Sequence, residues 1–106
     1  MRDMTLVMPL IGPLDPARLA DLQRQALRQI AQTGAHDLLL DITGVPTIDP
    51  QVAQGLLHLV ASARLMGAQV TLAGIRPEAA QILVSLGINP QEIRTASTLQ
   101  AALVQR

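Results

Sequence analysis

The sequence predicts an α/β domain in which about four strands form a largely parallel or mixed sheet with four helices. Three observations predict it. Short runs of branched apolar residues alternate with segments of helical period along residues 1–106. Two helical segments open with the same Asp-Pro pair, a common start signal for a helix. The length suits one hydrophobic core. Because strands that alternate with helices need crossover connections, the pattern favours parallel pairing in one domain over residues 1–106.

The first strand is expected over residues 5–11, where Pro9 indicates an edge strand or a bulge. A helix should follow, with Asp15 as its N-cap, Pro16 as its first residue and Gly34 as its stop. Its apolar positions recur at helical spacing and predict one buried stripe: Leu19, Leu22, Ala26, Leu27 and Ile30.

The second strand is expected over residues 38–42, a continuous apolar run typical of a strand buried on both faces. Residues 43–46 read as a loop. A second helix should begin at Asp49 and Pro50 and end at Gly67. Its predicted inner face is Val52, Ala53, Leu56, Leu57, Val60, Ala63 and Leu65.

The remaining elements are shorter. A third strand is expected over residues 69–73, and a third helix should begin at residues 76–78 and end at Gly87. A weak last strand is expected over residues 93–95, and Ser97 should cap a final helix. The predicted inner face of the third helix is Ala80, Leu83, Val84 and Leu86.

The composition argues against several classes of function. Phe, Tyr and Trp are absent, so the chain offers no aromatic platform for nucleic-acid bases. Its eight basic residues, all Arg, are balanced by eight acidic ones and create no net positive field. No apolar run approaches the ~20 residues of a membrane span. We therefore expect neither nucleic-acid nor membrane binding, and a cytoplasmic location.

Metal and cofactor sites are also not expected. Cysteine is absent, which excludes disulfides and thiolate ligands. His36 and His58 are too few for a metal site unless carboxylates complete it. His58 reads as a packed or half-exposed helical residue, and His36 as an incidental loop residue.

The most informative segment is residues 41–50, which join the end of a buried strand to the start of a helix. In open α/β sheets, ligands and partners bind at this edge. The free N–H groups of a helix start also suit an anion. We therefore take Asp41, Thr43, Gly44 and Asp49 as candidate contacts, followed by Pro50 and Gln51.

This segment, Asp-Ile-Thr-Gly-Val-Pro-Thr-Ile-Asp, resembles the signature loop of STAS domains (sulfate transporter and anti-sigma factor antagonist), in particular those of the stressosome group. Residues 8–15, 73–81 and 86–88 are similar to the same family in the same order, as are residues 97–100. The resemblance spans the chain. It implies a βα superhelical fold without catalytic residues, metal or cofactor, which binds homologous STAS proteins, a switch serine/threonine kinase or an anti-sigma factor. It also allows a homo-oligomer.

The resemblance further implies a phosphoacceptor hydroxyl after the aspartate of the loop, and a second one in the following helix. In this sequence those positions carry Pro50 and Ile82, neither of which can form a phosphate ester. We therefore expect the usual phospho-switch, which would add about −1.5 to −2 charges at a helix N-terminus, to be missing.

Several of these residues also have structural explanations. Asp49 could serve only as a cap, and Asp41 could only orient the loop through backbone N–H groups. Thr43 could tie its own backbone, and Gly44 could supply a permissive turn conformation. The secondary surface of Arg76, Pro77 and Glu78 could be solvated or could contact a partner or an anion.

Two other functions compete with a docking module. The helix start and Arg76 allow a module that senses a small ligand or nucleotide, although no glycine-rich phosphate loop with Lys is present. Asp41 at a strand end invites comparison with an aspartyl-phosphate receiver. However, the chain has no Lys and no Ser–His or Cys–His nucleophile system, so we expect no enzyme.

Overall fold

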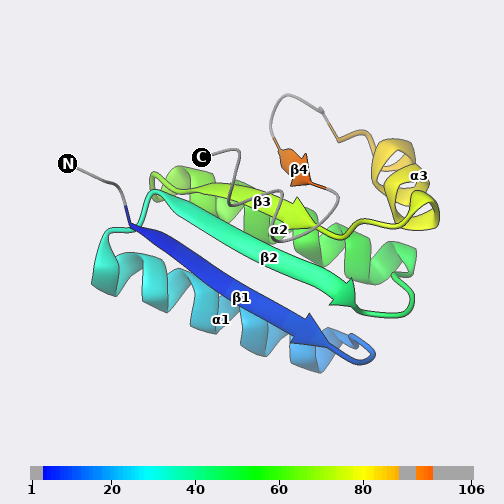
Figure 1. The fold of residues 1–106 in the computed structure, drawn as a ribbon, viewed down its shortest axis with the longest axis horizontal. Helices are drawn as coiled ribbons and strands as arrows, with labels where there is room; N and C mark the ends of the chain where they lie inside the picture. The colour runs from blue at the N-terminus through cyan, green and yellow to red at the C-terminus, as the bar shows by residue number, and fades with distance from the viewer. Residues whose placement is uncertain (1–3, 89–92, 97–106) are drawn as a thin grey trace.

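The described part of the chain, residues 4–88 and 93–96 of a computed structural model, alternates strands and helices from its first element to its last. Figure 1 shows their arrangement. The elements are β1 (Thr5–Ile11), α1 (Pro16–Thr33), β2 (Asp37–Gly44), α2 (Pro50–Leu65), β3 (Gln69–Ala73), α3 (Pro77–Ser85) and β4 (Arg94–Ala96).

The strands form one parallel sheet in the order β1-β2-β3-β4. Each strand pairs with the next one in sequence, and because the pairing is parallel, a helical crossover connects each pair. β1 lies at an edge, and its register with β2 shifts between Pro9 and Ile11. Both expectations for Pro9, an edge strand and a bulge, are confirmed.

The core lies between the sheet and the two long helices, which cover the same face of it (Figure 1). Leu38 and Leu40 of β2 point into this core, and Leu39 packs on the opposite face with Ala73 and Ala96. All three leucines are buried, so β2 is covered on both faces, as predicted.

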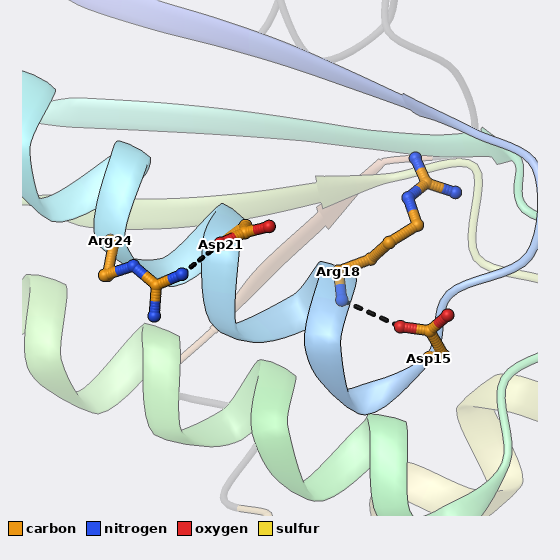
Figure 2. Close-up of polar contacts among 4 residues, drawn as sticks. All are labelled: Asp15, Arg18, Asp21 and Arg24. Carbon is orange, nitrogen blue, oxygen red and sulfur yellow. Dashed lines mark hydrogen bonds and ion pairs between the residues drawn. The ribbon is translucent and has the colours of Figure 1, made fainter.

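The helix starts follow the Asp-Pro signals. The Asp15 carboxylate accepts the backbone N–H of Arg18 at 2.8 Å (Figure 2), and Asp49 accepts that of Val52 at the same distance. Figure 2 also shows the ion pair between Asp21 and Arg24 one turn into α1. Each cap satisfies an N–H group that the first helical turn leaves without an intrahelical partner.

The predicted stops are less uniform. Gly34 ends α1 in a left-handed conformation (φ 69°), as expected. Gly67 also has a left-handed backbone (φ 89°), as expected of a helix stop, but it follows the C-cap Met66, and α2 itself ends at Leu65. The expected loop over residues 43–46 was wrong at its start, because β2 continues through Gly44.

The inner faces were predicted well for α1 and less well for the other helices. Leu65 is 90% exposed and Val84 64% exposed, although both were expected inside. Each lies in the last turn of its helix, past the edge of the core. Leu86 follows α3 and is also exposed, whereas Leu59 and Ala79 are buried positions that the pattern did not identify. Leu27, Leu57 and Ala80 are half-buried. The expected final helix after Ser97 lies outside the described residues.

Candidate functional site

The C-terminal end of β2 is stabilised by the side chain of Asp41, a residue of the same strand. One oxygen of the Asp41 carboxylate accepts the backbone N–H of Thr43 at 3.1 Å and the Thr43 hydroxyl at 2.7 Å. Asp41 is half-buried and Thr43 is exposed. This local turn fixes the Thr43 side chain at the point where β2 leaves the sheet.

Gly44 follows in extended backbone and not in the permissive turn conformation that the sequence indicated. Its carbonyl accepts the N–H of Gly12 at 2.9 Å, which joins the ends of β1 and β2. A Cβ atom here would lie 3.0 Å from the Leu10 carbonyl oxygen and 3.4 Å from Ile11. Gly44 therefore allows two strand ends to approach closely, a different use of glycine from the expected one.

The start of α2 presents the predicted contact residues to solvent. Asp49 caps the helix, and Pro50 and Gln51 are exposed in its first turn. Proline is favoured at this position because its missing N–H would have no intrahelical partner. The surface at the helix start therefore carries a pyrrolidine ring and an amide, without a hydroxyl at residue 50.

The segment before α3 packs against the end of β2. Gly74 has a left-handed backbone (φ 80°), and a Cβ atom there would lie 2.1 Å from the Thr43 hydroxyl oxygen. Arg76 then reaches back, and its Nη2 donates to the Thr43 carbonyl oxygen at 3.3 Å. The two candidate surfaces, residues 41–51 and residues 76–78, thus meet at Thr43.

A hollow of about 240 Å³ lies between these two segments. Its lining residues are mainly aliphatic, with Thr47 and the charged Arg76 and Glu78 as the polar ones. Of the site residues predicted from the sequence, only Arg76 and Glu78 line it. The lining residues are Ile42, Val45, Pro46, Thr47, Ile48, Gly74, Arg76, Glu78 and Ala79.

The hollow is the feature that sequence reasoning missed. Val45 and Ile48 are buried within a segment that was read as a polar contact loop. The available signal was the presence of two branched apolar residues on either side of Pro46 and Thr47, which are exposed. Gly74 was read only as a strand stop, and its contact with Thr43, distant in sequence, gave no local signal.

The second expected phosphoacceptor position lies on α3. Ile82 is half-buried and packs against the core. The Ser85 hydroxyl donates to the Ile82 carbonyl oxygen at 2.7 Å and so satisfies a group near the helix end. Residue 82 therefore contributes packing to the domain.

The two histidines lie apart from this site. His58 is exposed on α2, and so is less packed than expected, and His36 is exposed before β2. Among the described residues, no group of three or more His, Asp or Glu side chains is arranged to hold a metal ion. In the same part of the chain, no helix is both long and apolar enough to cross a membrane.

Comparison with known proteins identifies the fold family. The model of the STAS domain family matches residues 2–102. Among solved structures, a serine-to-glutamate variant of RsbS from Moorella thermoacetica has a TM-score of 0.82 and 26% sequence identity. That likeness covers 95% of this chain and 86% of the RsbS chain.

Two curated relatives come from Bacillus subtilis (strain 168): the RsbT co-antagonist proteins RsbRA and RsbRC. Each is 40% identical to this chain over 97 residues, which is 92% of this chain. The aligned region is 35% of RsbRA and 34% of RsbRC. The chain therefore spans about a third of the length of these relatives.

Proposed function

The chain belongs to the STAS domain family, and we propose that it is a regulatory, non-catalytic protein-interaction module of the stressosome type. Its docking surface comprises residues 41–51 and 76–78. Relatives named as RsbT co-antagonists support an RsbT-type switch kinase and homologous STAS proteins as its partners. By the same likeness, we assign all of residues 1–106 to one STAS domain that works in the cytoplasm.

The contact between Arg76 and Thr43 is the observation that carries this proposal. It fastens the start of α3 to the end of β2, so that two segments distant in sequence present one surface. Between them lies the aliphatic hollow, with a cation and an anion among its lining residues. Interfaces gain most of their affinity from an apolar anchor in such a hollow surrounded by polar groups.

We further propose that this surface works without the family's phospho-switch. Pro50 occupies the exposed first position of α2, and Ile82 is partly packed into the domain. Neither side chain carries a hydroxyl. Partner binding would therefore depend on partner concentration and competition, and not on a charge added at the start of α2.

Calorimetric titration of the unphosphorylated chain with Bacillus subtilis RsbT, and separately with RsbRA, tests the docking function. Saturable binding to either protein is the expected result. Absence of heat with both, checked by a second method such as biolayer interferometry, would contradict it.

The hollow also favours a second candidate, a module that senses a small ligand. Its volume suits a compact molecule with an aliphatic part and an anionic group that could meet Arg76. Titration with GTP, ATP and sulfate separates the two functions. Saturable binding of one of these, without binding of RsbT or RsbRA, would favour sensing over docking.

A further inference from the structure

The proposed docking surface is acidic, although the chain as a whole is neutral. Residues 41–51 and 76–78 contain three carboxylates, those of Asp41, Asp49 and Glu78, and one guanidinium, that of Arg76. The full chain balances eight basic against eight acidic residues. The surface therefore carries more negative charge than the chain does as a whole, and a partner of opposite charge associates with it faster and more selectively.

The three carboxylates are not neutralised within the domain. One oxygen of Asp49, which is exposed, accepts the Val52 N–H as the cap of α2. One oxygen of Asp41 accepts both bonds from Thr43. Glu78 is exposed in the first turn of α3. In the described part of the chain, no salt bridge joins any of the three to a cation.

Arg76 does not reverse this balance. It lines the hollow together with Glu78, two residues further along the chain, and its Nη2 donates to the Thr43 carbonyl oxygen. An acidic group that approached Arg76 would therefore also approach Glu78. These two charges offset each other at the hollow, and Asp41 and Asp49 leave the surface negative.

We infer, on the basis of the proposed docking function, that the partner presents a lysine or arginine side chain next to the aliphatic one that enters the hollow. The basic group compensates the carboxylates beside the hollow. The aliphatic side chain supplies most of the affinity, and the ion pairs supply orientation and association rate. A partner that offered an acidic group next to its aliphatic anchor would be repelled by the same carboxylates.

Neutralising the carboxylates without changing their shape tests this inference. Asn caps a helix as well as Asp does, so Asp49→Asn keeps the cap of α2 and removes its charge. Glu78→Gln likewise removes the charge at the start of α3. At a salt concentration of about 0.05 M, the double variant should bind Bacillus subtilis RsbT about tenfold more weakly than the unaltered chain. At about 0.5 M the difference should shrink, because salt screens exposed charges.

Asp21→Asn is the matched control. Asp21 is also an exposed carboxylate, but it lies on α1, outside the docking surface, and its removal should leave the affinity for RsbT unchanged. Circular dichroism should show that all variants are folded. If the double variant loses its fold, the single variants Asp49→Asn and Glu78→Gln decide, each with an expected loss of about threefold at low salt.

The possible results separate this inference from the docking function. If RsbT binds the unaltered chain and the double variant equally tightly at both salt concentrations, docking stands and the basic partner group is wrong. Tighter binding of the double variant would also overturn the inference, because it would mean that the partner offers an acidic group to Arg76. If RsbT does not bind the unaltered chain, the inference is overturned, and the titration with RsbRA then decides the docking function separately.

Discussion

The guanidinium of Arg76 donates from Nη2 to the Thr43 carbonyl oxygen at 3.3 Å, across 33 positions of sequence. The Thr43 hydroxyl in turn donates to the Asp41 carboxylate. The backbone of Thr43 packs against Gly74. Thr43 is therefore the point at which the end of β2 and the approach to α3 are joined. The shape of the proposed docking surface depends on this junction.

Replacing Gly74 with Ala should destabilise the domain by about 2–4 kcal/mol, because the new Cβ meets the Thr43 hydroxyl oxygen at 2.1 Å and its backbone nitrogen at 2.9 Å. Gly67→Ala is the matched control, since Gly67 has a similar φ of 89° but nothing within 4 Å of the added atom. It should cost only about 1–2 kcal/mol through its left-handed backbone. Urea unfolding measures both variants, and equal losses would mean that the contact with Thr43 contributes nothing.

Replacing Asp49 with Ala should cost about 0.5–2 kcal/mol of folding free energy, because Val52 N–H loses its acceptor. Asp15→Ala removes the same cap from α1, with the same 2.8 Å geometry, and serves as the control for stability. Both losses are read from chemical unfolding curves. If Asp49→Ala leaves stability unchanged but abolishes partner binding, Asp49 is a contact residue and not a cap.

Placing a hydroxyl at residue 50 should allow phosphorylation there. Pro50→Ser places Ser at an exposed position in the first turn of α2 and should lower the free energy of unfolding by about 0.4–1 kcal/mol, because proline is favoured there. Incubation with RsbT and ATP, followed by peptide mass spectrometry, should then find phosphate at residue 50 in the variant only. Stoichiometric phosphate on Thr43, Thr47 or Ser85 of the unaltered chain would instead show that the switch has moved.

The local signals of the sequence were sufficient for much of the fold. Asp15-Pro16 and Asp49-Pro50 placed two helix starts, and the spacing of Leu19, Leu22 and Ile30 gave the buried stripe of α1. Pro9 marked the edge strand correctly. Each of these depends on the conformational preference of a residue or on a short repeat, and so needs no knowledge of distant neighbours.

The parts that failed depend on tertiary contacts. Leu65 and Val84 keep the helical period but extend beyond the core, so periodicity alone could not show their exposure. The hollow beside Thr43 forms only when Gly74 and Arg76 return to the end of β2. This contact between segments distant in sequence depends on the order of strands in the sheet, which local patterns do not specify.

We propose that the surface around the start of α2 binds its partner in the unphosphorylated state. The most direct measurement is the affinity of Bacillus subtilis RsbT for the unaltered chain and for Gln51→Arg. Gln32→Arg is the control, since Gln32 is also an exposed amide and lies near the C-terminal end of α1. We predict binding without phosphorylation, a loss of about tenfold or more for Gln51→Arg and no change for Gln32→Arg. Equal affinity in all three proteins, or binding that requires phosphate, would contradict docking through the start of α2.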